Sequence, residues 1–178
     1  MPPALIVIDM QVGSFGNDSR RYDVPGLVAR LNALARRVRA SGGTVIFVQH
    51  DGPEGDPHHP NQPGWAILPE LERLPADVTV RKTACDSFLG TELDRVLAER
   101  GLRDLVITGC ATDYCVDTTV RAALARGYRT TVPSDGHTTA DRPHLSAAKI
   151  IEHHNAIWRD FIAPSGPAVL CPCDDVRV

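Results

Sequence analysis

The chain has 178 residues, 43% of them apolar, which is enough for one buried core and too short to predict two domains. Its formal net charge is −3 and its basic residues are scattered. The sequence therefore lacks the cluster of basic residues that is typical of a nucleic-acid-binding protein. No apolar stretch approaches the ~20 residues of a membrane span, and no secretory signal pattern opens the sequence. We expect one domain over residues 1–178, located in the cytoplasm, with no nucleic-acid or membrane partner.

Short β-branched stretches alternate with helical patterns along almost the whole chain. Strands are predicted over residues 4–9, 44–50, 78–82, 105–109, 128–133 and 168–170. Helices are predicted from Pro25 to the Gly42-Gly43 pair, and over residues 91–100, 115–125 and 145–161. The strands show little polar alternation, which predicts a parallel sheet covered by helices on both faces. Residues 51–69 are rich in Gly, Pro and His without a period, which predicts a long irregular loop.

Three chemically active side chains fall where predicted strands end. Asp9 ends the first strand, Lys82 ends the third, and Cys115 follows the fourth at a strand-to-helix junction. Taken singly, they are typical of a helix-capping carboxylate, a surface lysine and a small buried hydrophobe. Because the carboxyl ends of parallel strands meet at one edge of a sheet, their shared location favours a common site instead.

Together these groups predict a nucleophile with its base. The N-terminus of a helix lowers the pKa of a nearby thiol, which predicts a reactive thiolate at Cys115. Asp9 can accept the thiol proton, and Lys82 can stabilise the resulting charges. The backbone N–H groups of Ala111 and Cys115 are the expected donors to a developing oxyanion.

The remaining cysteines are interpreted as free thiols, because five is an odd number for a disulfide framework. Cys85 and Cys110 are expected to pack near the site. Cys171 and Cys173 could form a redox or metal-binding pair, but the sequence has no second cluster to complete such a site, which favours an incidental pair.

Four stretches resemble the isochorismatase-like cysteine hydrolase superfamily, in the right order and spacing over nearly the whole chain. They are Ile8-Asp9-Met10-Gln11, Lys82 with Asp86-Ser87-Phe88 and Gly90-Thr91, Gly109 to Val116, and Ser134 to Thr139. The resemblance implies a Rossmann-like three-layer α/β/α fold with a six-stranded, mostly parallel sheet, in a homo-oligomer that is a dimer or a tetramer. It matches Asp9, Lys82 and Cys115 to the family's catalytic triad, and it implies a non-proline cis peptide between Cys110 and Ala111.

The resemblance also implies an activity. The superfamily includes amidohydrolases that cleave a C–N bond through a thioester on the cysteine, and isochorismatases that cleave a vinyl ether without needing the thiol. Because Cys115 is present, a cofactor-free hydrolase acting on a small amide or ureide is favoured. Vinyl ether hydrolysis with Asp9 as general acid stays open, as does a non-enzymatic thiol redox sensor. Asp9 and Lys82 argue against the sensor, which needs no proton shuttle.

The chain departs from the nicotinamidases of this superfamily in their metal-binding stretch. Those enzymes carry Asp-x-His after the second strand, whereas here Asp51 is followed by Gly52 and Pro53, and proline has no side-chain ligand. A site built from Asp51, His58 and His59 stays an alternative. We predict a metal-free enzyme that is not a typical nicotinamidase.

Residues near the triad or on the long loop are candidate contacts to a small-molecule substrate. They are Gln11, Phe15, Trp65, Phe88, Thr112 and Tyr114. Aromatic walls commonly line small-molecule sites, although each aromatic residue is equally typical of a core. The two polar residues suit a structural hydrogen bond at least as well. His137 is expected in a structural turn, because the resemblance offers Asp9 as the base.

Overall fold

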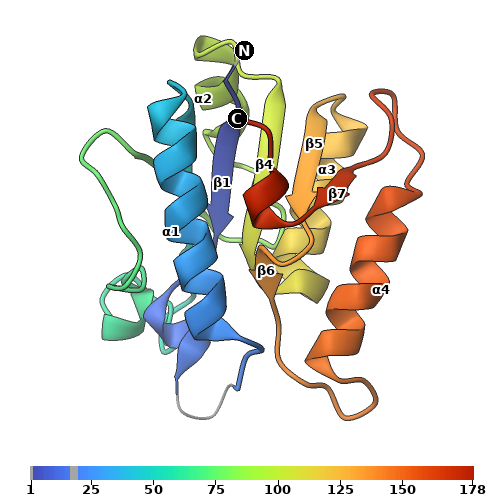
Figure 1. The fold of residues 1–178 in the computed structure, drawn as a ribbon. Helices are drawn as coiled ribbons and strands as arrows, with labels where there is room; N and C mark the ends of the chain where they lie inside the picture. Colours follow the sequence, from blue (N-terminus) through green and yellow to red (C-terminus); the bar gives the residue numbers. More distant parts are fainter. Residues whose placement is uncertain (1, 17–19) are drawn as a thin grey trace.

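The computed structural model describes residues 2–16 and 20–178, which form a central sheet with helices on both faces (Figure 1). The strands are β1 (Ala4–Ile8), β2 (Thr44–His50), β3 (Val78–Lys82), β4 (Asp104–Cys110), β5 (Arg129–Pro133), β6 (His137–Thr138) and β7 (Val169–Cys171). The strand order in the sheet is β3-β2-β1-β4-β5-β7. The short strand β6 pairs with the last two residues of β4, after the part of β4 that pairs with β5. All of these strand pairings are parallel. The predicted parallel α/β fold is confirmed.

The helices and short turns connect these strands. The helices are α1 (Val24–Ala40), α2 (Leu93–Glu99), α3 (Asp117–Ala125) and α4 (Ala147–Arg159). Three 3₁₀ turns, η1 (Val12–Phe15), η2 (Pro63–Trp65) and η4 (Cys173–Asp175), and one π-helical turn, η3 (Thr112–Val116), lie between them. None of the described helices combines the length and the apolar content needed to cross a membrane.

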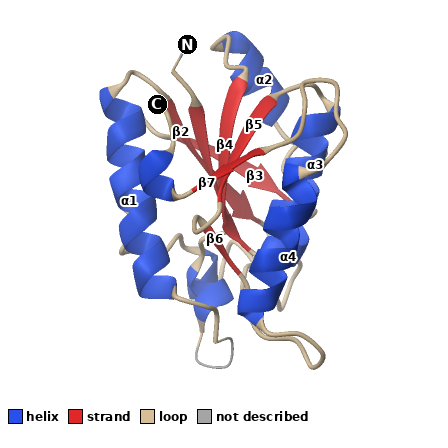
Figure 2. Ribbon diagram, turned by 45° about the vertical axis from the view of Figure 1, so that its right-hand side comes forward, coloured by secondary structure: helices blue, strands red, loops and turns tan. Residues whose placement is uncertain are grey.

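The alternating side chains of β1 build two separate cores, one on each face of the sheet. Leu5 and Val7 pack with the apolar stripe of α1, which is Leu27, Leu31, Leu34, Ala35 and Val38. Ala4, Ile6 and Ile8 pack on the other face, which α2, α3 and α4 cover (Figure 2). Because both faces are covered, every residue of β1 is buried, as expected for an apolar strand without polar alternation.

Two predicted elements differ from the structure. The six-stranded sheet has a seventh strand, β6, which is two residues long and therefore too short to leave a periodic signal in the sequence. The helix predicted from Cys115 to Ala125 begins only at Asp117, because residues 112–116 first form the π-helical turn η3. Cys115 therefore lies inside that turn and not at the first residue of α3.

Strands β1 and β4 approach each other unusually closely at Gly109. Its φ is +118°, and a Cβ atom built there would lie 2.2 Å from the carbonyl oxygen of Ile8. Only glycine fits both the backbone conformation and the space. The close approach places the end of β4, and thus Cys110 and the following turn, beside the end of β1.

We expect the substitution Gly109→Ala to destabilise the fold by more than about 3 kcal/mol, because it adds backbone strain and a steric clash with β1. The matched control is Gly127→Ala, at a φ of +79° with no atom within 4 Å of the added Cβ, which should cost only about 1–2 kcal/mol. Urea unfolding of both variants measures the difference. Equal losses in the two variants would contradict a special role for the close approach.

Candidate active site

The three predicted catalytic side chains meet at the carboxyl edge of the sheet. Lys82 ends β3, Asp9 follows β1, and Cys115 lies in η3 after β4; the spatial order β3-β2-β1-β4 makes these strands near neighbours. Lys82 Nζ is 2.7 Å from Asp9 Oδ2 and 3.4 Å from Cys115 Sγ. The structure thus brings together an ammonium, a carboxylate and a thiol from three distant parts of the chain.

Asp9 takes an uncommon backbone conformation at the end of β1. Its φ is +48°, in the left-handed region, and its amide donates a hydrogen bond to the Val48 carbonyl at 2.9 Å. A non-glycine residue in this region usually indicates a functional or strongly determined position. Oδ2 pairs with Lys82, while Oδ1 is buried without a hydrogen-bond partner among the described residues. One carboxylate oxygen is therefore left to exchange a proton.

The Lys82 ammonium is fully buried and all three of its N–H groups have an acceptor. Besides Asp9 and Cys115, it donates to the Ala84 carbonyl at 2.9 Å. Burial by itself lowers the pKa of Lys82, but the Asp9 carboxylate and the Cys115 sulfur raise it more, so its pKa lies above the ordinary value. Lys82 consequently stays charged beside the thiol.

The predicted lowering of the Cys115 pKa is wrong. Burial, and after it the charge of Asp9, raises the pKa of the thiol well above its usual range, and Lys82 only partly offsets this. Cys115 lies just before the N-terminus of α3, inside η3, and burial outweighs the stabilisation of a thiolate that such a position offers. The resting sulfur is therefore a protonated thiol, which needs a base to become a nucleophile.

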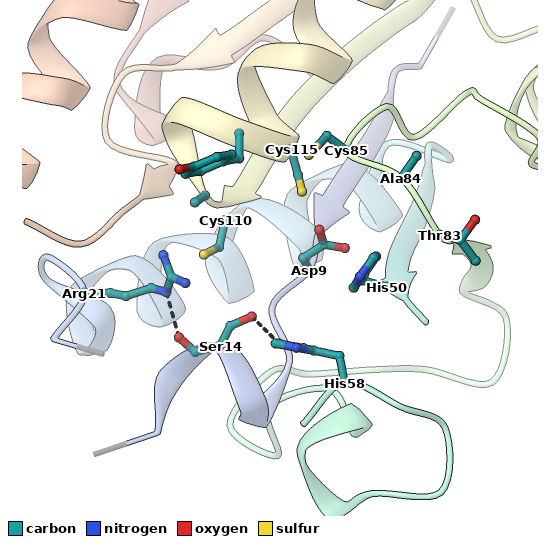
Figure 3. Close-up of a pocket in the computed structure, with 12 residues that line it drawn as sticks. Asp9, Ser14, Arg21, His50, His58, Thr83, Ala84, Cys85, Cys110 and Cys115 are labelled. Atoms are coloured by element: carbon teal, nitrogen blue, oxygen red, sulfur yellow. Dashed lines mark hydrogen bonds between the residues drawn. The ribbon is translucent and has the colours of Figure 1, made fainter. Parts of the chain in front are cut away.

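The triad opens into a pocket of about 360 Å³, a size typical of small-molecule sites. Besides Asp9, Ala111 and Cys115, its lining is Ser14, Arg21, His50, His58, Thr83, Ala84, Cys85, Cys110 and Tyr114. Figure 3 shows these side chains arranged around the gap below Cys115, with Arg21 and His50 on opposite sides. The peptide bond between Cys110 and Ala111 is cis, as the resemblance implied.

Sequence reasoning missed four polar residues of this lining: Ser14, Arg21, His50 and Thr83. His50 could have been found, because it ends β2 in register with Lys82 of β3 and thus lies at the same sheet edge. Burial, and then the Lys82 charge, lowers the pKa of His50, and its Nδ1 is buried with no hydrogen-bond partner in the described part of the chain. Ser14 and Arg21 had no comparable signal, since neither follows a strand.

A hydrogen-bonded chain forms the lower wall of the pocket. His58 Nε2 lies 2.9 Å from Ser14 Oγ, and His58 Nδ1 lies 2.9 Å from Asp56 Oδ1. The dashed line in Figure 3 marks the bond between Ser14 and His58. This chain joins the loop after β2 to η1.

Only one of the six candidate substrate contacts lines the pocket. Tyr114 does so, with 53% of its surface exposed. Phe88 instead lies in the core and stacks on Tyr128 at 5.7 Å between ring centroids. Phe15 packs beside the α1 core, outside the pocket lining. Packing with the helices thus keeps both rings out of the lining of this pocket, in spite of their closeness in sequence to the triad.

The other three candidates are not part of the pocket lining, and each is held in hydrogen bonds. Gln11 Nε2 donates to the His50 and Trp65 carbonyls, which fastens the long loop to the sheet. Trp65 Nε1 donates to Asp51 at 2.7 Å. Thr112 Oγ1 lies 2.9 Å from His137 Nδ1. For Gln11 and Thr112 the sequence had left open a structural hydrogen bond as the alternative to substrate binding, and both side chains make such bonds.

His137 is a buried structural residue. It lies between Thr112 and Asn155, at 2.9 and 3.1 Å. Burial lowers its pKa to about 4, so its ring is neutral at physiological pH. It lines a cavity other than the one that holds Cys115.

The alternative metal site is not assembled in the described part of the chain. Both carboxylate oxygens of Asp51 are engaged, Oδ1 by Trp65 and Oδ2 by Arg81, each at 2.7 Å. His58 is turned to Ser14 and Asp56. Among residues 2–16 and 20–178, no group of three or more His, Cys, Asp or Glu side chains is placed to hold a metal ion.

Residues 3–158 match the family model of the isochorismatase domain. The chain belongs to the isochorismatase family. Its similarity to curated members includes 35% identity over 140 residues to a streptothricin hydrolase of Streptomyces noursei, covering 79% of this chain and 56% of that protein. A ureidoacrylate amidohydrolase of Variovorax paradoxus is 32% identical over 161 residues, covering 70% of this chain and 64% of that protein.

The fold of this isochorismatase-family chain also matches solved structures. The crystal structure of N-carbamoylsarcosine amidase from Thermoplasma acidophilum superposes with a TM-score of 0.79 and 25% identity, covering 100% of both chains. An isochorismatase from Pseudomonas putida has a TM-score of 0.88 at 28% identity, covering 99% of this chain and 90% of that one. In contrast, the chain spans little more than half the length of the streptothricin hydrolases that it matches.

The raised thiol pKa predicts how the neighbours of Cys115 control its reactivity. In wild type, alkylation of Cys115 by iodoacetamide should need a pH above the usual thiol range of about 8.5. Asp9→Asn removes a negative charge and should move the profile to lower pH. Lys82→Met removes a positive charge and should move it to higher pH.

Tandem mass spectrometry measures the label on Cys115, with the exposed Cys85 as reference in the same sample. Circular dichroism checks that each variant keeps the fold. Unchanged profiles in both variants would show that burial alone sets the thiol pKa, and would contradict the roles of Asp9 and Lys82.

Proposed function

We propose that this isochorismatase-family protein is a cysteine hydrolase that cleaves a C–N bond of a small amide or ureide through a thioester on Cys115. The observation that carries the proposal is the buried Lys82 ammonium in contact with both the Asp9 carboxylate and the Cys115 sulfur. The names of the relatives, streptothricin hydrolase, ureidoacrylate amidohydrolase and N-carbamoylsarcosine amidase, support this chemistry.

In the first step Asp9 acts as the base. Its unpartnered Oδ1 accepts the thiol proton as Cys115 Sγ attacks the carbonyl carbon of the substrate, so an S–C bond forms and the C=O electron pair moves to oxygen. Lys82 stabilises the negative charge on Asp9 before this transfer and the charge that develops on sulfur during it. Ala111 and Cys115 both line the pocket, and their backbone N–H groups are the proposed donors to the oxyanion; each such donor contributes on the order of 3 kcal/mol.

In the second half of the reaction Asp9 acts as the acid. It returns the proton to the leaving nitrogen as the C–N bond breaks, and an amine or ammonia departs. A water molecule then gives a proton to Asp9 and attacks the thioester, which releases the acid product and restores the thiol. A thiol with a raised pKa suits this cycle, because the resting site keeps one proton available between sulfur and carboxylate.

Vinyl ether hydrolysis is the second candidate, favoured by the unpartnered Oδ1 of Asp9 in the pocket. A protonated Asp9 would deliver its proton to the vinyl carbon, and water would attack the resulting cation. This reaction makes no bond to sulfur.

The variant Cys115→Ala separates the two reactions. It should keep the fold and lower the turnover of amides and ureides at least about 1,000-fold, because the covalent step is lost. Release of ammonia from a panel of primary amides and ureides measures turnover. Cys171→Ala, which changes a thiol outside the pocket, is the matched control and should retain full activity.

Undiminished amide hydrolysis by Cys115→Ala would refute the nucleophile. Cleavage of an isochorismate-like vinyl ether, retained in Cys115→Ala and lost in Asp9→Asn, would establish the second candidate in its place.

A further inference from the structure

A second thiol lies beside Cys115 in the wall of the same pocket. Cys85 and Cys115 both belong to the lining, and Figure 3 shows them next to each other at the upper edge of the pocket. After burial and the charge of Asp9, a charge on Cys85 also contributes to the raised pKa of Cys115. The hydrolase chemistry uses only the sulfur of Cys115, so Cys85 is a nucleophilic group without a role in that cycle.

Hydrogen bonds hold the loop that carries Cys85 against the segment that carries Cys115. The Ala84 carbonyl accepts from Lys82 Nζ at 2.9 Å, and the same ammonium donates to Cys115 Sγ at 3.4 Å. The Cys85 carbonyl accepts from Thr119 Oγ1 at 3.5 Å, and Thr119 is four residues after Cys115 in the chain. Because the backbone is tied on both sides, the two thiols stay close neighbours.

The two thiols differ in their exposure. All five cysteines lie in the described part of the chain, and among them Cys85 is the exposed one, whereas Cys115 is half-buried. An oxidant in solution therefore reaches Cys85 first, because oxidation follows the exposure of a thiol. Cys110 is the third thiol of the lining, but it is fully buried, and burial raises its pKa to about 12. Cys110 therefore stays protonated and does not compete with Cys115 for a partner.

We propose that Cys85 is a redox modification site, at which a hydroperoxide forms a sulfenic acid that Cys115 converts into a reversible Cys85–Cys115 disulfide. The disulfide occupies the sulfur on which the thioester would form, so it inactivates the enzyme. Only this loss of activity rests on the proposed hydrolase function; the disulfide itself does not. The proposal differs from a non-enzymatic redox sensor because the thiol pair regulates an enzyme.

The chemistry takes two steps. In the first, the Cys85 thiol attacks the hydroperoxide, so an S–O bond forms, the O–O bond breaks and an alcohol departs, or water when the oxidant is hydrogen peroxide. In the second, Cys115 gives its proton to Asp9 and attacks the sulfur of the Cys85 sulfenic acid. The S–S bond forms, the S–O bond breaks, and the leaving hydroxide takes the proton from Asp9 as water. The two thiols lose two electrons in total, and the peroxide gains them.

The second step uses groups that the site already places around Cys115. Asp9 Oδ1 is the base of the proposed hydrolysis, and it accepts the same proton here. Lys82 Nζ, 3.4 Å from the sulfur, stabilises the charge that develops on Cys115 during the attack. A site that prepares Cys115 to attack a carbonyl carbon thus also prepares it to attack an oxidised sulfur next to it.

Tandem mass spectrometry detects the disulfide without any turnover. The full chain is treated with hydrogen peroxide, free thiols are blocked with iodoacetamide in denaturant, and trypsin releases Cys85 in residues 83–95 and Cys115 in residues 104–121. These two peptides should appear joined. Fragmentation between Cys110 and Cys115 should place the bond on Cys115. Dithiothreitol should separate the peptides, because it reduces a disulfide by thiol exchange.

Release of ammonia from the best substrate of the amide and ureide panel measures the effect on activity. In wild type, peroxide should lower turnover at least about 10-fold, and dithiothreitol should restore it. Cys85→Ser keeps the size of the side chain but cannot form the bond. Relative to its own untreated activity, this variant should be inactivated at least about 10-fold more slowly, and dithiothreitol should not reverse the loss.

Cys171→Ser is the matched control, because it removes a thiol outside the pocket lining. It should respond to peroxide and to dithiothreitol as wild type does. Circular dichroism checks that both serine variants keep the fold, and the peptide analysis of wild type needs no variant.

Four results would overturn the proposal. They are no joined peptide in wild type, a joined peptide that carries Cys110 in place of Cys115, a disulfide that leaves turnover intact, and reversible inactivation of Cys85→Ser at the wild-type rate. A Cys85–Cys115 disulfide in a chain that hydrolyses no amide or ureide would instead refute the proposed hydrolase and leave the modification site standing.

Discussion

The candidate site depends on the buried contact of the Lys82 ammonium with the Asp9 carboxylate, 2.7 Å apart. Each charge would be costly to bury alone, and removing one partner of such a pair typically costs about 3–5 kcal/mol. Because Lys82 also touches the Cys115 sulfur, the pair places a permanent positive charge beside the nucleophile. It also leaves one oxygen of Asp9 without a hydrogen-bond partner among residues 2–16 and 20–178, and this oxygen can accept a proton.

The sheet makes this contact geometrically possible. Strands β3, β2, β1 and β4 are adjacent and parallel, so their ends deliver side chains to one edge. Two local backbone features complete the placement: Asp9 turns out of β1 in a left-handed conformation, and Gly109 lets β4 approach the backbone of Ile8. The site is thus a property of strand order and close packing rather than of any one motif.

The protonation state of the site follows from burial. A helix terminus was expected to favour a thiolate, but desolvation and the nearby Asp9 carboxylate outweigh it and raise the pKa of Cys115. A protonated thiol next to a base would give the proposed amidase chemistry a proton to pass to the leaving group.

The sequence by itself determined the parallel α/β fold, the strand ends that carry Asp9, Lys82 and Cys115, and the family, because apolar periodicity and local motifs are written in consecutive residues. Only the tertiary structure decided which other side chains face the pocket. Phe88 packed into the core against Tyr128, while Ser14 and Arg21 reached the pocket wall through contacts between distant segments. Burial, pKa and ion pairing depend on such long-range packing, for which a linear pattern holds no signal.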